Sequence, residues 1–332
     1  MTLNNKPLVS FVVLSYNFEP FLQDCIESVL KQQGDHDFEI IIVDDASSDE
    51  SVSLIRSYSD PRIHFVQHRI NQGHIVTVHD GISYAKGKFI ARIDGDDRYH
   101  SNFLNDVLPI FDAHPEVGLV YGDASLINEK GEVTEERSEQ VHMRKDFKGN
   151  EFLSLLDKNF ICAPTVIARS EAWLSALPVP EGLAFHDWYF TLMISREYEF
   201  YYISRVLADY RVHPQNLHSK ISRDKSEETS IFRLLNRVFN EREEVEELEI
   251  RKRQVKRRVY SSHYLTLANK YFWFEMNSDA RRCYLRALNY NSGYVFRGSV
   301  VRRLIGTLVG RKTYEVFKGL FKSFYSRKPA AI

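Results

Sequence analysis

The sequence KFIARIDGDD (residues 88–97) places three carboxylates, Asp94, Asp96 and Asp97, directly after an apolar run. The run has the length and composition of a β-strand, so we predict a buried strand whose end carries the acids. Like charges this close raise one another's pKa and repel unless water, hydrogen bonds or a cation offsets them. The stretch therefore predicts a strand that delivers acidic groups to one place.

Strand-like and helix-like segments alternate around this run. We expect strands at 9–15, 38–45, 62–68 and 88–94, and helices at 20–33, 49–58 and 74–87. Such alternation favours an α/β fold with a mostly parallel central sheet flanked by helices. Further along, 117–127 and 199–213 have strand patterns and 186–195 has a helical one. From about residue 220 only helical patterns remain, so we predict one domain at 1–220 and an all-helical region at 221–332.

Composition excludes several classes of protein. Forty-four Lys and Arg against 45 Asp and Glu give a net charge of -1, which offers no electrostatic reason to expect a nucleic-acid partner. The three cysteines, Cys25, Cys162 and Cys283, have no CxxC spacing and indicate neither a disulfide framework nor a zinc site. No signal-like segment opens the chain, and no run approaches the roughly 18 apolar residues of a membrane span. We therefore expect a cytoplasmic protein.

Polar residues follow three of the predicted strands. The first strand ends in SYN (15–17), the second in DDASSD (44–49) and the fourth in DGDD (94–97). In open α/β sheets, ligands bind beyond the carboxyl ends of the strands. This edge of the sheet is therefore the candidate site.

Two interpretations of the acidic cluster are open from the residues alone. Asp and Gly are common turn residues, so the cluster fits a solvated turn. It also fits a hard divalent cation, which prefers carboxylate oxygens on a rigid support and leaves positions for substrate phosphates. The chain has no GxxxxGK[ST] loop and no GxGxxG after its first strand, which argues against a P-loop enzyme and against a dehydrogenase.

The order and spacing of VSFVVLSYN, FEIIIVDDASSDES and NQGHIVTVHDGISYAKGKFIARIDGDD resemble family 2 glycosyltransferases of the GT-A fold. The resemblance covers about the first 215 residues. It implies that the acidic cluster is the DxD motif of that family, which binds the ribose and the divalent cation, Mg²⁺ or Mn²⁺, of a nucleotide sugar. Asp94 and Asp96 match the two DxD carboxylates.

The resemblance also implies roles for individual residues. Asp187, in HDW (186–188), matches the catalytic base, although an Asp at a helix start is also a common helix cap. The implied metal ligands are Asp96, its neighbour Asp97 and His213, with His218 a weaker second histidine. The implied nucleotide-sugar contacts are Ser15, Tyr16, Asn17, Asp45, Asn71, Gly73, Asp94, Asp96 and Arg211.

The chain departs from the family pattern at two places. Family members usually read Ala-Arg-Asn after NxG, whereas this chain has Thr77, Val78 and His79. They also read Glu-Asp where it has His186 and Asp187. The first change removes an arginine contact to the nucleotide, and the second removes the Glu, but neither removes the implied base or metal ligands.

The C-terminal region has three features. Residues 264–287 fit one tetratricopeptide-like helical hairpin, which we expect to pack on the catalytic domain. Residues 241–258 fit a solvated helix with pairs at i,i+4 such as Glu249 and Arg253. Residues 294–328 carry nine bases and one acid, Glu315, beside two apolar stripes. This basic tail fits an anionic membrane surface or packing against the protein's own core.

The leading hypothesis is an inverting, metal-dependent glycosyltransferase that moves a sugar from a nucleoside diphosphate donor, by resemblance a UDP-sugar, to a hydroxyl acceptor in cell-surface glycan synthesis. Its expected partners are the donor, a glycan or lipid-linked acceptor and the inner face of the plasma membrane. A nucleotide-sugar-binding module without catalysis is the alternative. A nucleotidyltransferase is a third, which the absence of an early glycine-rich basic loop disfavours.

Overall fold

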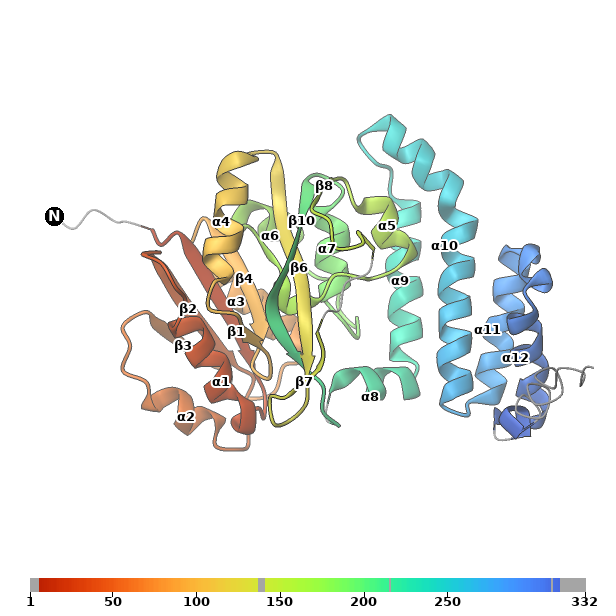
Figure 1. The fold of residues 1–332 in the computed structure, drawn as a ribbon, viewed down its shortest axis with the longest axis horizontal. Helices are drawn as coiled ribbons and strands as arrows, with labels where there is room; N and C mark the ends of the chain where they lie inside the picture. The colour runs from red at the N-terminus through yellow and green to blue at the C-terminus, as the bar shows by residue number, and fades with distance from the viewer. Residues whose placement is uncertain (1–5, 137–140, 215, 312, 317–332) are drawn as a thin grey trace, which may run out of the picture. The chain divides into compact units, whose positions relative to one another are not determined.

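The computed structural model describes residues 6–136, 141–214, 216–311 and 313–316, and its chain divides into two compact units (Figure 1). Unit 1 comprises residues 1–155 and 159–216, and unit 2 comprises residues 156–158 and 217–332. The sequence predicts a boundary after residue 220, and the structural division falls after Asn216. The two units are described separately below.

Unit 1 is built on a mixed sheet with the strand order β3-β2-β1-β4-β9-β6-β10-β5. Two short strands lie off this path, with β7 paired to β6 and β8 to β10. The strands are β1 (Val9–Ser15), β2 (Phe38–Asp44), β3 (Ile63–Gln67), β4 (Phe89–Asp94), β5 (Arg98–Tyr99), β6 (Val117–Ile127), β7 (Val133–Glu135), β8 (Phe147–Gly149), β9 (Ile167–Arg169) and β10 (Glu199–Arg211).

The direction of the strands brings their carboxyl ends to one edge. Strands β1 to β4 are mutually parallel, and β6 is parallel to β10. Because β9 is antiparallel to both β4 and β6, the two parallel groups point the same way. The last residues of β1, β2, β4 and β10 therefore lie along the same side of the sheet, as the α/β prediction requires.

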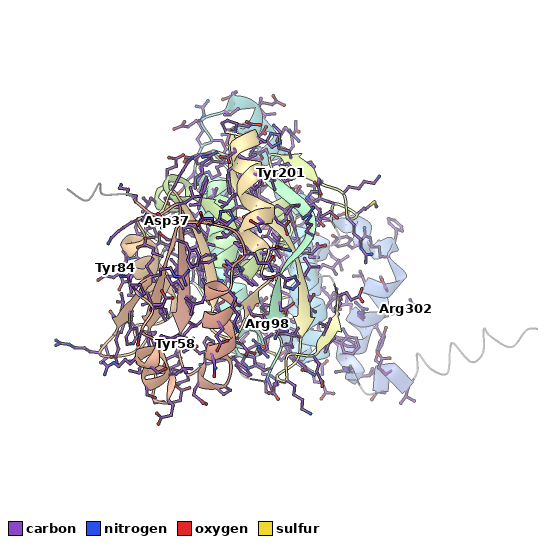
Figure 2. All side chains as sticks on the ribbon, turned by 60° about the vertical axis from the view of Figure 1, so that its left-hand side comes forward. Asp37, Tyr58, Tyr84, Arg98, Tyr201 and Arg302 are labelled. Atoms are coloured by element: carbon purple, nitrogen blue, oxygen red, sulfur yellow. The ribbon has the colours of Figure 1, made fainter. Side chains whose placement is uncertain are left out.

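Helices cover this sheet and close its core (Figure 2). They are α1 (Glu19–Leu30), α2 (Ser51–Ser57), α3 (His74–Tyr84), α4 (Phe103–Ala113), α5 (Phe152–Asp157), which crosses into unit 2, α6 (Ser170–Ser175) and α7 (Asp187–Ile194). Phe11 of β1 lies at the centre of the core, with aromatic contacts to Phe38, Tyr99 and Phe103. A Cβ on Gly81 of α3 would lie 2.4 Å from Val12, so only glycine permits the close approach of α3 to β1.

Unit 2 is helical throughout the part that the structure describes. It contains α8 (Leu217–Arg223), α9 (Ser226–Asn240), α10 (Glu246–Trp273), α11 (Asn277–Tyr290) and α12 (Gly298–Val309). Helices α10 and α11 form the predicted hairpin (Figure 1), with Leu267, Tyr271, Ala280 and Tyr284 buried. None of the described helices combines the length and the apolar character needed to cross a membrane.

The charged segment at the start of α10 differs from its prediction. The pair of Glu249 and Arg253 forms as expected, with 2.5 Å between Arg253 Nε and Glu249 Oε1. Lys252, however, is fully buried, and its Nζ lies 2.7 Å from Glu243 and 2.8 Å from Glu249. Part of this helix is therefore not solvated, because the turn before α10 folds back and supplies the Glu243 carboxylate and the Glu241 carbonyl to the lysine.

Candidate active site

The candidate site lies at the carboxyl edge of the sheet, where β1 and β2 lead into paired turns. The buried Asp44 accepts hydrogen bonds from Ser15 Oγ (3.0 Å) and from the Ser47 amide (2.8 Å). Asn17 has a positive φ of 55° and accepts the Ser48 amide at 2.8 Å. Ser15 and Asn17 thus shape the turns, while the neighbouring Tyr16 is 45% exposed and available to a ligand.

Asp45 fixes the loop before α3. Its Oδ1 accepts the Gln72 amide at 2.7 Å and lies 2.8 Å from His68 Nδ1, and its Oδ2 accepts the Gly73 amide at 2.8 Å. Gly73 has a φ of 87° that favours glycine, and the loop at this position borders open space, since a Cβ there would meet nothing within 4 Å. The predicted residues Asp45 and Gly73 are therefore in contact. Asn71, two residues earlier, is exposed.

The DxD carboxylates differ in their surroundings. Asp94 is paired with Arg92 of the same strand, at 3.1 Å from Nη1 to Oδ1 and 3.2 Å from Nη2 to Oδ2. Asp96 Oδ2 lies 2.9 Å from His213 Nε2, and both side chains are almost fully buried. The structure therefore brings together Asp96 and His213, which are 117 residues apart in sequence.

Asp97 and Arg211 lie next to this pair and contact each other. The Arg211 amide donates to Asp97 Oδ1 at 2.8 Å, and Arg211 Nε donates to the Asp96 carbonyl at 2.7 Å. Burial, followed by the charges of Asp96 and Asp94, raises the pKa of Asp97 well above its usual range. The metal role of Asp97 stays a prediction.

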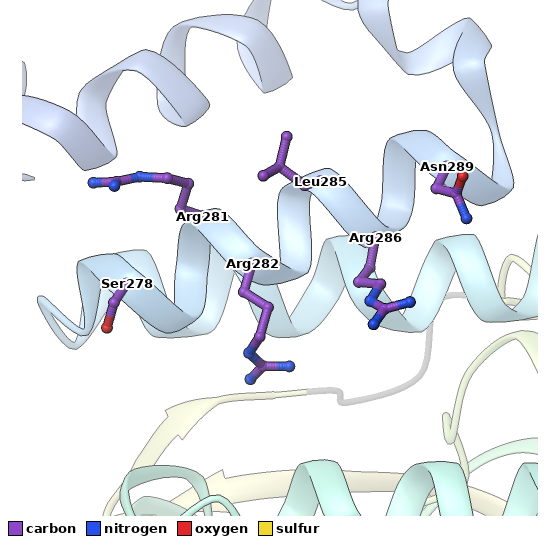
Figure 3. Close-up of a pocket in the computed structure, with 6 residues that line it drawn as sticks. All are labelled: Ser278, Arg281, Arg282, Leu285, Arg286 and Asn289. Atoms are coloured by element: carbon purple, nitrogen blue, oxygen red, sulfur yellow. The ribbon is translucent and has the colours of Figure 1, made fainter.

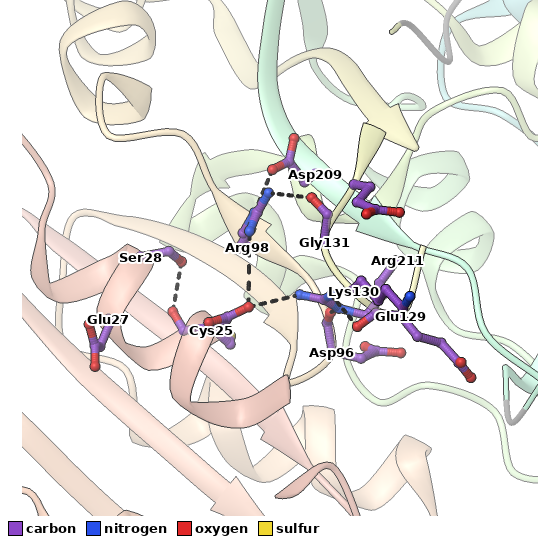
Figure 4. Close-up of polar contacts among 12 residues, drawn as sticks. Cys25, Glu27, Ser28, Asp96, Arg98, Glu129, Lys130, Gly131, Asp209 and Arg211 are labelled. Atoms are coloured by element: carbon purple, nitrogen blue, oxygen red, sulfur yellow. Dashed lines mark hydrogen bonds and ion pairs between the residues drawn. The ribbon is translucent and has the colours of Figure 1, made fainter. Parts of the chain in front are cut away.

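The Arg211 guanidinium is held by the protein itself (Figure 4). Its side chain is 1% exposed and donates to the carbonyls of Asn128 and Glu129, both at 3.2 Å, and to Asp24 Oδ2 at 3.2 Å. Arg98, beside it, donates to Asp209 and to the Gly131 carbonyl. These contacts favour a supporting role for Arg211 over the direct nucleotide-sugar contact that the resemblance implies.

Asp187 is the first residue of α7 and is half-buried. Its Oδ2 accepts a hydrogen bond from Asn159 Nδ2 at 3.0 Å, and the start of the helix has no side-chain cap. The carboxylate therefore does not cap the helix, which was the other interpretation of this residue. Its acceptor capacity remains available for a proton.

His186 and His74 lie beside Asp187 and Arg92. Arg92 Nη1 is 2.6 Å from His186 Nε2, and the two imidazole rings have centroids 5.3 Å apart. Burial, then the Arg92 cation and His74, hold the pKa of His186 well below its usual range. Burial likewise lowers the pKa of His74. Among the described residues, neither His186 Nδ1 nor His74 Nε2 has a hydrogen-bond partner.

The donor set at Asp96 fits a divalent cation of the predicted kind. One carboxylate and one imidazole nitrogen lie within 2.9 Å of each other, and Mg²⁺ or Mn²⁺ commonly takes one or two carboxylates and completes its shell with substrate phosphates and water. Within the described ranges, no group of three His, Cys, Asp or Glu side chains has the arrangement of a metal site. His218 lies in the segment whose side chains the structure does not describe.

Comparison with known proteins now defines the family. Residues 10–177, about half of the chain, match the model described as glycosyl transferase family 2. The chain belongs to this family. The similarity extends to a protein named for teichuronic acid biosynthesis, the glycosyltransferase TuaG of Bacillus subtilis, which is 37% identical over 107 residues, or 32% of this chain and 42% of TuaG.

Two further proteins resemble this family 2 glycosyltransferase over more of its length. An uncharacterized glycosyltransferase of Methanocaldococcus jannaschii is 27% identical over 67% of this chain and 77% of its own. The crystal structure of residues 1–349 of S. aureus TarS in complex with UDP-GlcNAc matches with a TM-score of 0.67 and 17% identity, over 85% of this chain and 81% of that one. The fold comparison confirms the expected GT-A type fold.

Sequence reasoning missed several residues of this glycosyltransferase's site. Arg92, His68 and Asn159 contact Asp94, Asp45 and Asp187 respectively. Arg92 gave a signal, since a charged residue inside the apolar run FIARI requires a partner. His68 and Asn159 gave none, because their contacts depend on loops that only the fold brings together. At the departure from the family pattern, Thr77 and Val78 are buried in α3 and His79 is half-buried.

A separate hollow of about 550 Å³ lies on α11 in unit 2 (Figure 3). Its lining includes Arg281, Arg282 and Arg286. Arg281 donates to Thr307, and Arg282 is paired with Glu228 and Asp279. Arg282 is thus paired with carboxylates, and Arg281 is held by neutral groups of Thr307.

Proposed function

We propose that this family 2 glycosyltransferase moves a sugar from a nucleoside diphosphate donor to a hydroxyl group of an acceptor, with inversion at the anomeric carbon. One observation carries the proposal. Arg92 contacts both Asp94, a DxD carboxylate, and His186, the residue before Asp187. This link supports the proposal that the residues with implied roles in donor binding and in base catalysis form one site.

The proposed donor is a UDP-sugar. Asp45 has three of its roughly four acceptor positions occupied by the protein, which leaves one for the imide N–H of uracil. The exposed ring of Tyr16 is suited to lie against the base. TarS, whose fold is similar, has been solved with UDP-GlcNAc and with UDP, which supports the same donor class here.

Asp96 and His213 would hold the divalent cation, Mg²⁺ or Mn²⁺, with Asp97 as the neighbouring carboxylate. The cation, when bound, supplies positive charge that stabilises the leaving diphosphate. Asp94 would bind the ribose, with its carboxylate oriented by Arg92. The burial of Asp96 and His213 and their contact of 2.9 Å support a pair that is arranged before the metal-bound nucleotide arrives.

Asp187 would act as the general base. The acceptor oxygen forms a bond to the anomeric carbon as Asp187 takes the hydroxyl proton, and the bond from that carbon to the diphosphate oxygen breaks. The electron pair of the broken bond leaves on the nucleoside diphosphate. Asn159, which donates to Asp187 Oδ2, orients the carboxylate so that its other oxygen can receive the proton.

The proposed acceptor is a glycan or a lipid-linked glycan of the cell surface. The name of TuaG, which refers to teichuronic acid biosynthesis, supports a role in cell-surface polysaccharide synthesis. The matched region spans only 42% of TuaG, so the acceptor of this chain is part of the proposal.

Peripheral membrane association is the remaining part of the proposal. Helix α12 exposes Ile305 (57%) and Leu308 (67%), and Arg302 stands on the same helix (Figure 2). The second predicted stripe, which consists of Phe317, Leu320, Phe321 and Phe324, lies outside the described residues. Sedimentation with anionic vesicles tests the idea: binding that weakens as salt rises supports it, and no binding at low ionic strength contradicts it.

A donor screen tests the proposed activity. The protein is incubated with nucleotide sugars and Mn²⁺, and release of nucleoside diphosphate is measured with and without a glycan acceptor. We expect Asp187→Asn to bind donor like the wild type while transfer falls by roughly two to four orders of magnitude. Donor binding without release would indicate a binding module, and pyrophosphate release would indicate a nucleotidyltransferase. Transfer by Asp187→Asn at the wild-type rate would place the base elsewhere.

A further inference from the structure

Arg92 is a charged residue inside an apolar strand. It lies on β4 between Ala91 and Ile93, which are fully buried, and its own side chain is 3% exposed. A guanidinium without partners is very costly to bury, so such a residue is retained only where its donors are paired. The partners of Arg92 therefore define its role.

Those partners lie on two different elements of unit 1. Arg92 binds Asp94 through both Nη atoms, at 3.1 and 3.2 Å, and its Nη1 lies 2.6 Å from His186 Nε2. Asp94 ends β4, and His186 is the N-cap residue directly before α7. The guanidinium thus bridges the end of one strand and the start of a helix that follows 94 residues later.

The contact between Arg92 and His186 fixes the state of the histidine ring. A guanidinium has N–H donors and no acceptor, so His186 Nε2 must accept the hydrogen bond. The ring is then the neutral tautomer that has no proton on Nε2 and carries its proton on Nδ1. The rotation of the ring is set at the same time, because Nε2 must point at Arg92 for a contact of 2.6 Å.

We propose that Arg92 is a positioning residue for the transfer step, which fixes Asp187 relative to Asp94 through the His186 ring. The inference rests on the proposed function, because it takes Asp187 as the base and Asp94 as a donor ligand. Asp187 directly follows His186 and is held from its other side by Asn159. An error of about 1 Å in the placement of a reacting group can cost roughly a hundredfold in rate, so this link affects turnover more than donor binding.

The first test separates turnover from donor binding. His186→Leu removes the acceptor but leaves the pair of Arg92 and Asp94, so we expect kcat to fall at least about tenfold with the KM for donor nearly unchanged. His186→Gln, whose amide oxygen can replace Nε2 as acceptor, recovers most of that loss. The double variant Arg92→Met with His186→Leu loses less than the product of the two single losses, because both changes break one link.

Arg169→Met is the matched control. Arg169 also lies in this sheet, on β9, where it is the strand partner of Phe89 at the opposite end of β4. Its side chain donates to the carbonyl of Val117. Its loss removes a structural arginine without touching Asp94 or His186, so turnover should stay within about threefold of the wild type. If Arg92→Met does not fold, His186→Leu and its recovery by His186→Gln carry the test.

A second readout needs no substrate. Nuclear magnetic resonance of labelled histidine, with His186→Gln for assignment, should show the His186 ring protonated at Nδ1 in the wild type and in Arg169→Met, and should lose this preference in Arg92→Met. A wild type that transfers sugar while His186→Leu turns over like Arg169→Met would overturn the inference, as would a ring protonated at Nε2. A wild type that transfers no sugar from any donor would instead overturn the proposed function itself, and the inference with it.

Discussion

The substitution Asp45→Ala tests how the nucleotide edge of the site is built. The carboxylate accepts two backbone amides of the loop before α3 and lies 2.8 Å from His68, so all three contacts are lost together. A hydrogen bond to a charged group is worth about 1.5–3 kcal/mol. Gln72 is exposed and Gly73 half-buried, so water replaces part of the loss at both amides, whereas the His68 contact is buried. We therefore expect Asp45→Ala to lower the free energy of unfolding by about 3 kcal/mol.

The same change should weaken the binding of UDP, because the loop that carries Asn71 and Gly73 is released. Denaturant unfolding measures the first effect, and isothermal titration calorimetry with UDP and Mn²⁺ measures the second. Asp49→Ala is the control, since Asp49 also accepts two backbone amides at this edge, those of Glu19 and Ser51, but does not contact the loop. It should cost about 1 kcal/mol and leave UDP affinity unchanged. An Asp45→Ala variant as stable as Asp49→Ala, or one that binds UDP like the wild type, would refute this reasoning.

Two further predictions concern buried titratable side chains, Lys252 and His186. Lys252→Met removes the buried cation that contacts both Glu243 and Glu249, so the free energy of unfolding should fall by about 3–5 kcal/mol. Lys256→Met, at an exposed position of α10, should change it little, and denaturant unfolding of both variants measures the difference. Burial holds the pKa of His186 in the folded protein well below its usual 6.5. Below pH 6.5 the histidine is therefore protonated in the unfolded state but not in the folded state, so the free energy of unfolding falls as the pH falls. His186→Gln should remove up to about 1.4 kcal/mol per pH unit of this loss as the pH falls below 6.5, and an unchanged slope would contradict it.

Regular elements of unit 1 were predictable because their periodic patterns are local. The strands predicted at 9–15 and 117–127 are found as β1 and β6 with the same bounds, and the helix predicted at 186–195 is found at Asp187–Ile194. Three-residue elements such as β9 (Ile167–Arg169) were not predicted, because three residues are too few to show a period. Yet β9 joins the two parallel halves of the sheet and so determines its mixed topology.

The candidate site was predictable in its location more than in its contacts. The rule that ligands bind at the carboxyl ends of strands placed Asp45 and Asp96 at one edge. The sequence did not reveal that Arg211 donates to the carbonyls of Asn128 and Glu129, because that loop lies far from it in sequence. It did not reveal that Lys252 is buried either, because its burial depends on how the turn before α10 folds back. Pairing between Arg92 and His186 spans 94 residues and likewise follows only from the three-dimensional fold.

The central claim is that Asp96 and His213 hold a cation that binds the nucleotide, and calorimetry of UDP binding with and without Mn²⁺ tests it most directly. We predict that the wild type binds UDP more tightly when Mn²⁺ is present and that Asp96→Asn keeps its fold but loses this gain, because an amide cannot supply the anionic ligand that a hard cation prefers. Asp24→Asn, which changes a carboxylate that contacts Arg211 from α1, should keep the gain. Equal affinity for UDP with Mn²⁺ in the wild type and in Asp96→Asn would contradict the account.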